Sequence, residues 1–447
     1  MARVRAIGRR RLGPAARRAL IPGSGLVLLS SATGGMHGDI FQLYVVDTLG
    51  YSPSLVSVIA LGMIVSIPVQ LLAPGIVSRF GHRTVMVAGS LTLAPALLLL
   101  FSAGLIIDGS RIAAAAVLFA GATVAGVGIS ICFGAAWTAW YVEFAEPADR
   151  PLFLAMFSFA AQGTVIMAFL VQTVCFDGAV TEVFYRGVVI YCLIYLLGSI
   201  IVYRHLPETT VREPISTFGK GGWREALRDH RGRLVVFGSA AQFVIGVPLL
   251  AVYALTVLDL PAAAIGVMLI VRSAASFVFA PVAGWFIGRI GTTTSIRVLG
   301  VALAAQMVLW TLLPRVGHHL AAIAAFTVLV VLSQVSRYAF GLAMSAIAFD
   351  VVEPEHRVRT FALVDAVSSA AMHLNLAAGG ALVAASSTAA LLDTSWIRLD
   401  PVKIVTAAGT VIIAYLTVAF HRMATGFVKQ SLPDETTQKQ RTIRDEM

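Results

Sequence analysis

Long apolar runs separated by short polar loops make up most of this chain of 447 residues. A helix that crosses a bilayer needs about 20 mostly apolar residues, and twelve runs reach that length. We predict transmembrane helices over residues 25–48, 54–78, 84–107, 112–142, 151–176, 183–203, 234–258, 262–288, 296–314, 319–349, 360–385 and 402–421. Since a spanning helix satisfies its own backbone hydrogen bonds, the fold class we expect is an all-α membrane protein with twelve transmembrane helices.

Composition supports a membrane environment over a soluble one. Hydrophobic residues make up 58% of the chain and charged residues 13%, whereas a soluble domain carries about 25% charged residues. The three cysteines lie in apolar runs without the spacing of metal ligands. We therefore expect a bilayer as the partner of the apolar surface, and no metal or cofactor.

The basic charge follows the predicted topology. The net charge is +10, and 26 of the 33 lysine and arginine residues fall on the side of the membrane that holds both termini, against five on the opposite side. Basic loops remain in the cytoplasm, so we expect cytoplasmic termini and no nucleic-acid partner. Arginine outnumbers lysine 29 to 4, which is typical of a GC-rich bacterial genome and indicates the bacterial inner membrane.

A polar segment divides the chain into two halves. Residues 205–233 form the one long internal connection, rich in glycine, proline and charge. The predicted parts are a basic cytoplasmic N-terminus (1–24), a six-helix bundle (25–204), a cytoplasmic linker (205–233), a second six-helix bundle (234–421) and a cytoplasmic tail (422–447).

Two loop motifs recur in both halves at nearly one spacing. PGIVSRFGHR (74–83) aligns with GWFIGRIGTT (284–293), which places Gly81 opposite Gly291 at an offset of 210 residues. EFAEPADRP (143–151) aligns with DVVEPEHRV (350–358) at an offset of 207. Two parallel six-helix repeats are an architecture of secondary transporters, so we predict two pseudo-symmetric bundles.

On these motifs the chain resembles the major facilitator superfamily of secondary transporters. The family motif G-x-x-x-D-R-x-G-R between the second and third helices, and its repeat in the second half, correspond to Gly75, Ser78, Arg79, Gly81, Arg83, Gly284, Arg289 and Gly291. The resemblance implies transport by alternating access. Ser78 replaces an aspartate that helps to latch the two halves in the family, so a charged latch is not expected. The hydroxyl of Ser78 is expected to reach a neighbouring helix terminus instead, and both loop glycines suit turns that require φ > 0.

A second resemblance concerns the first helix. GDIFQLYVVDTLGYSPS (38–54) resembles the macrolide and siderophore exporters of the superfamily. The Gly-Pro-Gly-Gly pattern of antiporters is absent from the predicted fifth helix, LFLAMFSFAAQGTVIMAFLV, which argues against drug export in particular.

Among the ionisable residues inside the predicted helices, the functional candidates are Asp39, Arg272, Arg337, Asp365 and His373. A charge at mid-bilayer costs at least about 2.5–3.5 kcal/mol, so such residues face a cavity or pair with one another. In the functional interpretation Asp39 and Asp365 are proton-coupling candidates, while Arg272, Arg337 and His373 contact substrate. Alternatively, the two carboxylates neutralise the two arginines and no coupling ion is involved. Because the charges balance, the sign of the substrate stays open.

Uncharged polar and aromatic residues extend the list of substrate-binding candidates. Gln42 shares a helical face with Asp39, Gln334 lies three residues before Arg337, and Asn375 follows His373. Trp137 and Tyr141 belong to an aromatic stripe that either stacks on a ring-bearing substrate or forms an interfacial belt.

These patterns favour a transporter over an enzyme. The chain lacks a nucleotide-binding loop and the HExxH and GxSxG motifs. We expect a monomeric secondary transporter, with proton-coupled efflux of an amphipathic metabolite or drug-like compound by antiport as the first interpretation. Proton-coupled uptake of an organic anion or other nutrient, and a non-transporting receptor on the same fold, are the alternatives.

Overall fold

A computed structural model describes residues 14–133, 182–208, 230–244, 249–312, 320–351, 357–390, 392–393 and 398–431, with some positions between 136 and 166. In the first half the elements are α2 (Pro14–His37), α3 (Asp39–Leu43), η1 (Tyr44–Thr48), α4 (Pro53–Gly62), η2 (Met63–Val65), α5 (Ser66–Phe80), α6 (His82–Leu91), α7 (Leu93–Ile106), α8 (Arg111–Phe133) and α11 (Glu182–His205). In the second half they are α13 (His230–Val244), α14 (Leu250–Thr256), α15 (Ala262–Ile290), α16 (Thr292–Thr311), α17 (Leu320–Val351), α18 (Arg357–Thr388), β1 (Leu392–Asp393), β2 (Arg398–Leu399) and α19 (Pro401–Ser431).

The observed helices confirm the predicted membrane fold. Within the described ranges, nine helical segments are long and apolar enough to cross a bilayer. Their exteriors carry exposed large side chains, for example Leu197 on α11 and Tyr415 on α19, as expected of a surface in contact with lipid. In the part of the chain that the structure describes, a short antiparallel ladder that pairs Leu392 with Leu399 is added to the all-α prediction.

The first and seventh predicted spans are interrupted, which the hydropathy pattern did not reveal. The first span begins at Pro14 instead of residue 25 and breaks at Gly38, after which α3 starts at Asp39. In the second half, α14 starts at Leu250, and the residue before it, Leu249, has φ 49°. Leu249 lies 211 residues after Gly38, close to the offset of 210 between the repeated turns. At the other end of the chain, α19 continues to Ser431, past the predicted limit of 421.

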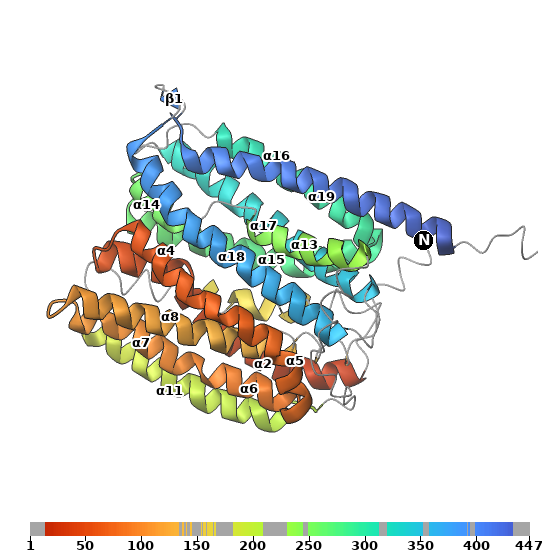
Figure 1. Ribbon diagram of the computed structural model, residues 1–447, viewed down its shortest axis with the longest axis horizontal. Coiled ribbons are helices and arrows are strands. Elements are labelled where there is room, and N and C mark those ends of the chain that lie inside the picture. The colour runs from red at the N-terminus through yellow and green to blue at the C-terminus, as the bar shows by residue number, and fades with distance from the viewer. Residues whose placement is uncertain are drawn as a thin grey trace, which may run out of the picture.

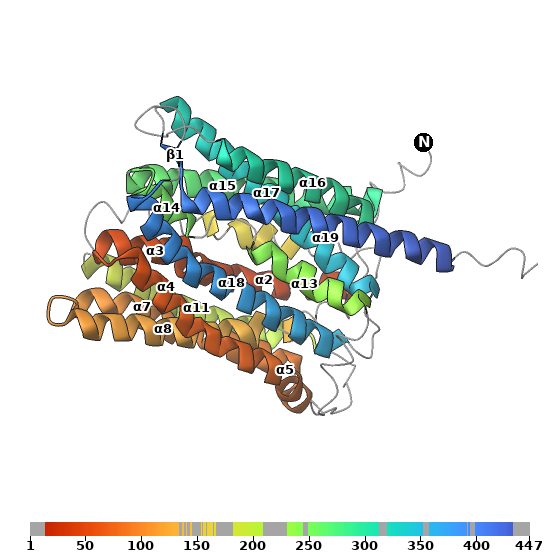
Figure 2. The same ribbon diagram turned by 45° about the horizontal axis from the view of Figure 1, so that its top comes forward.

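The helices form two bundles, one from each half of the chain (Figures 1 and 2). α18 packs against α4 and α5 along their boundary. α2 begins and α19 ends at the same end of the molecule, where the α5–α6 and α15–α16 turns also lie (Figure 1). This arrangement agrees with an even number of crossings.

The two repeated turns have the same backbone geometry. Gly81 has φ 78° and ψ 153°, and Gly291 has φ 85° and ψ 152°. In both, the glycine amide donates to a carbonyl four residues earlier, at 2.7 Å to Val77 and 3.0 Å to Ile287. The prediction that both turns need φ > 0 is confirmed, and the match supports the internal repeat.

The side chains of the loop motif bind within their own half. Arg83 donates from Nε to the Tyr203 carbonyl at 2.7 Å and approaches Glu208 at 3.6 Å, which ties α6 to the end of α11. Arg79 lies over the Phe80 ring, as Arg289 does over Trp285. The expectation for Ser78 is wrong: its hydroxyl donates to the Gly75 carbonyl of its own helix at 2.9 Å, because a short hydroxyl side chain reaches the carbonyls of the preceding turn most easily.

Candidate substrate site

An ion pair joins the two halves in the interior of the molecule. Arg272 of α15 donates from Nη2 to Asp39 Oδ2 at 2.5 Å, and the two side chains are 15% and 17% exposed. Asp39 is the first residue of α3, and the pair joins positions 233 residues apart. The two candidate residues therefore lie together.

Two apolar clusters contain residues from both halves, and their members include residues before and after Asp39 in the sequence. One contains Leu26 and Val27 of α2 together with Phe361 and Leu363 of α18. The other contains Tyr44, which follows α3, with Tyr253 of α14 and Val383 of α18. Because the side chains of Asp39 and Arg272 are mostly buried, the attraction between the two charges is stronger than at a surface.

A second arginine belongs to the same charge cluster. Arg337 of α17 interacts electrostatically with both members of the pair, being repelled by Arg272 and attracted by Asp39. Its hydrogen bond goes to Gln334 Oε1 at 3.1 Å. In the described part of the chain no carboxylate lies within ion-pair distance of Arg337. Counted by formal charge, the cluster of Asp39, Arg272 and Arg337 carries one net positive charge.

The break in the first span lies next to this cluster, because Gly38 immediately precedes Asp39. Discontinuous helices mark the binding sites of many secondary transporters, because the ends of half-helices present free backbone groups to substrate and ions. Here the break at Gly38 places Asp39 at the start of α3. Chain geometry and charge therefore identify the same location.

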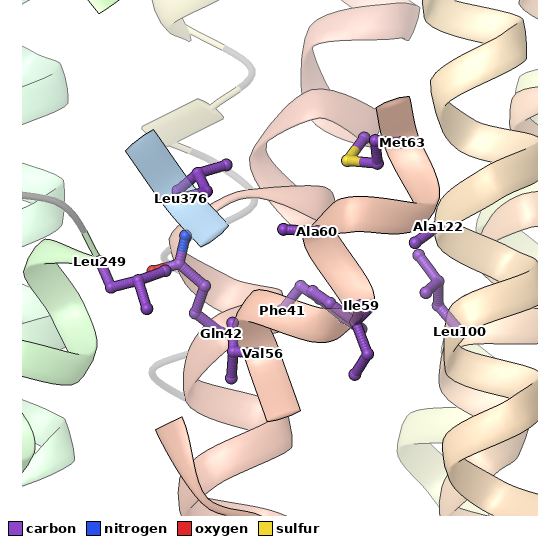
Figure 3. A pocket seen from close by; sticks show the side chains of 10 residues that line it. All are labelled: Phe41, Gln42, Val56, Ile59, Ala60, Met63, Leu100, Ala122, Leu249 and Leu376. Atoms are coloured by element: carbon purple, nitrogen blue, oxygen red, sulfur yellow. The ribbon is translucent and has the colours of Figure 1, made fainter. Parts of the chain in front are cut away.

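A small apolar pocket is lined by Gln42, which follows Asp39 by three residues in α3 (Figure 3). Gln42 is 9% exposed, and its Oε1 accepts no hydrogen bond from any described residue. Leu249 and Leu376 of the second half complete the wall. The predicted role of Gln42 at a binding site is consistent with this position.

The remaining polar candidates on α18 are not part of the charge cluster as the structure describes it. His373 is buried, and its Nδ1 has no hydrogen-bond partner among the described residues. Asn375 donates to the Phe243 carbonyl of α13 at 3.2 Å, which is a contact between helices of one half. Asp365 Oδ2 is buried and likewise has no hydrogen-bond partner in the described ranges.

The aromatic stripe packs on itself. Trp137 and Trp140 stack with ring centroids 5.5 Å apart, and Phe157 meets the edge of Trp137 at 5.0 Å. Trp140 also donates to the Pro207 carbonyl at 2.9 Å. The described rings belong to a buried core cluster, so the contacts that the structure shows for them are packing contacts. Tyr141 lies outside the described residues.

Two contacts between the halves were missed by the sequence analysis. Gln70 of α5 donates to Ser369 of α18 at 2.7 Å and to Ser130 of α8 at 3.0 Å. Ser57 of α4 accepts from the Gly380 amide at 2.8 Å and donates to the Leu376 carbonyl at 2.9 Å. Gln70 and Ser57 are uncharged polar residues inside apolar spans, a signal that the sequence analysis had used only for residues close to a charged candidate.

In the described ranges no group of three or more histidine, cysteine or acidic residues could hold a metal ion. The described side chains of the site form an ion pair and a hydrogen bond.

Comparisons with solved structures agree with this fold. A bacterial homologue of the iron transporter ferroportin in its outward-facing state has a TM-score of 0.67 at 14% identity, over 92% of this chain and all of the other. The human organic anion transporter MFSD10 has a TM-score of 0.65 at 13% identity, over 91% of this chain and all of the other. The nucleoside transporter NupG, solved as a point mutant, has a TM-score of 0.63 at 11% identity, over 91% and 99% of the two chains.

No curated protein matches this sequence. The sequence profile of the Major Facilitator Superfamily, in contrast, matches residues 24–335, well over half of the chain. With two helical bundles, a repeated turn and an interior ion pair between the halves, the chain belongs to the Major Facilitator Superfamily, a family of multi-pass membrane transporters.

Proposed function

We propose that this protein is a secondary transporter of small organic anions, and that Arg337 binds the anionic group of the substrate. The charge of the interior cluster carries the proposal. Asp39 already neutralises Arg272, whereas Arg337 is held by a neutral glutamine. A charge inside a membrane span costs at least about 2.5–3.5 kcal/mol unless it faces a cavity or finds a partner. A substrate carboxylate supplies the missing partner, since the planar guanidinium of arginine binds carboxylates with two parallel hydrogen bonds.

The choice of an anion departs from our first interpretation of the sequence. Efflux of an amphipathic, drug-like compound drew support from the aromatic stripe, whose described rings pack against each other. The similar structures are described as transporters of iron, organic anions and nucleosides, so they do not select a substrate. The anion proposal rests on this chain's own residues.

Proton coupling is the second part of the proposal, with Asp39 as the proton site. Protonation of Asp39 removes its charge and releases Arg272, which breaks the one described ion pair between the halves. Movement of the halves is thereby linked to proton binding. Asp365 is a second proton-site candidate because its buried Oδ2 has no hydrogen-bond partner in the described part of the chain. We place the protein as a monomer in the bacterial inner membrane with cytoplasmic termini, as the bias of basic residues predicts.

Thermal unfolding of the purified protein tests the anion site. The melting temperature is compared in the presence of carboxylates, lipophilic cations and neutral amphiphiles. A ligand at 100 times its Kd raises the free energy of unfolding by about 2.7 kcal/mol. We expect carboxylates to stabilise the wild type and Arg289→Ala, an exposed control, but not Arg337→Ala. Stabilisation by cations, or equal stabilisation of Arg337→Ala by carboxylates, would contradict the proposal.

Flux in liposomes tests the proton site. An imposed pH gradient should drive movement of the stabilising carboxylate in the wild type, and the sign of the effect gives the direction of transport. We expect Asp39→Asn to remove this dependence while ligand binding remains. Gradient-driven flux at the wild-type rate in Asp39→Asn would show that the proton binds elsewhere.

A further inference from the structure

The apolar pocket that Gln42 lines has a feature that its packing does not explain. Its walls are hydrocarbon from both halves, and among the residues that line it Gln42 alone is polar. In Figure 3 the amide of Gln42 lies on the side of the pocket formed by Leu249 and Leu376.

The amide of Gln42 has no described hydrogen-bond partner to hold it there. Its Oε1 is fully enclosed and accepts no hydrogen bond in the described part of the chain, and the residue is 9% exposed. A buried acceptor without a donor destabilises the folded protein, so the ligand-free structure gains nothing from the polar end of this side chain. A bound molecule with a hydrogen-bond donor would remove that penalty.

The position of Gln42 connects the pocket to the charge cluster. Gln42 follows Asp39 by three residues within α3, which places the two side chains on one helical face about 4.5 Å apart along the axis. A molecule that contacts both side chains therefore extends over about one helical turn. Its charged end lies near Asp39 and its uncharged end near Gln42, on the same face of the helix.

We propose that this pocket holds the uncharged part of the substrate, an apolar body that carries a hydroxyl group, and that Gln42 selects for that hydroxyl. This inference rests on the proposed function, which places the anionic group at Arg337. A hydroxyl can donate to Oε1 and accept from Nε2 of the same amide. The hydrocarbon walls disfavour a second charge at this end. The substrate class is accordingly that of hydroxylated, monoanionic amphipathic acids.

Because both halves line the pocket, its shape depends on how the two halves are arranged. Leu249 precedes α14 and Leu376 lies on α18, whereas Val56 and Ile59 lie on α4. The pocket is complete when the halves meet at this end of the bundle. Binding of the uncharged end thus favours the conformation described here over one in which these walls are apart.

The test uses straight-chain carboxylates of increasing length, each with and without a terminal hydroxyl, and the corresponding alcohols. Affinities come from thermal unfolding of the purified full-length protein. We expect the wild type to bind the hydroxylated acid of the best-fitting length about tenfold more tightly than the plain acid. Gln42→Met, which preserves side-chain length and flexibility, should bind both acids equally. Ala60→Leu fills the pocket without altering the amide, and it should weaken both acids together.

The ligand-free stability of Gln42→Met gives an independent readout. Removal of an unsatisfied acceptor leaves the melting temperature unchanged or raises it, whereas removal of a structural hydrogen bond lowers it. A lowered melting temperature in Gln42→Met would overturn the inference.

The ligand series separates this inference from the proposed function. Equal binding of plain and hydroxylated acids by the wild type, with loss of both in Arg337→Ala, overturns the role of Gln42 and supports the anion site. Binding of the alcohols alone, lost in Gln42→Met, supports the pocket and overturns the anion site. Stabilisation by none of these compounds overturns both.

Discussion

The ion pair between Asp39 and Arg272 should contribute strongly to stability, and a double-mutant cycle measures this contribution. Two unit charges about 4 Å apart attract by about 4 kcal/mol at an effective dielectric constant of 20. Removal of one partner from a fully buried pair costs about 3–5 kcal/mol. Because these side chains are 15% and 17% exposed, we take the lower value, about 3 kcal/mol, for Asp39→Asn and for Arg272→Gln.

The double variant should be more stable than either single variant. Replacement of both ions by neutral amides leaves no buried charge without a partner, so we expect a loss of about 1 kcal/mol and a coupling energy well above 1 kcal/mol. Equilibrium unfolding by denaturant in detergent micelles gives the four free energies. Additive losses in the double variant would refute the reasoning, since they would mean that the two charges do not stabilise each other.

A second ion pair provides the matched control. Arg83 and Glu208 approach to 3.6 Å, but the Glu208 side chain is 77% exposed. Exposed pairs contribute about 0.2–1 kcal/mol. The same cycle with Arg83→Gln and Glu208→Gln should therefore give a coupling energy several times smaller than that of the interior pair.

Two further predictions concern glycines. Gly380→Ala should destabilise the protein by about 1–3 kcal/mol, because its Cβ would meet Ser57 Oγ and lie 2.6 Å from the Pro53 carbonyl. Ser57→Ala removes the first of these two contacts, so the double variant should recover only part of the lost stability. Unfolding by denaturant measures both variants. Gly81→Ala should cost about 1–3 kcal/mol, since φ 78° with ψ 153° is a region occupied almost exclusively by glycine. Gly291→Ala should cost a similar amount, and a wild-type unfolding midpoint in either variant would contradict the assigned turn geometry.

Apolar run length was sufficient to predict most helices, and local turn chemistry was sufficient for two turns. The glycines at 81 and 291 adopt φ > 0 as their position between two helices required. Hydropathy could not reveal the break at Gly38, because the apolar pattern continues across it. The hydroxyl of Ser78 was misplaced because the sequence does not show that a carbonyl of its own helix is the nearer acceptor.

The sequence identified the candidate residues of the site, but not which carboxylate pairs with which arginine. The cost of a charge in the bilayer identified Asp39, Arg272 and Arg337 as functional candidates. Which carboxylate neutralises which arginine depends on packing between helices that are 233 residues apart. That pairing decided the sign of the substrate we propose, which the sequence had left open. Gln70 and Ser57 were missed because an uncharged polar residue in an apolar helix more often bonds within its own helix than across a boundary.

The contact of Ser57 with α18 has a consequence for how easily the two halves part. Its hydroxyl bonds to the Gly380 amide and the Leu376 carbonyl, two groups that are each other's partners in a regular α-helix. When α4 moves away, the Gly380 amide can donate to the Leu376 carbonyl within α18. Neither group then needs a hydrogen bond from water. The backbone of α18 therefore loses no hydrogen bond when this contact opens. The equilibrium between closed and open arrangements at this point is then governed by apolar contact and by whatever fills the neighbouring pocket.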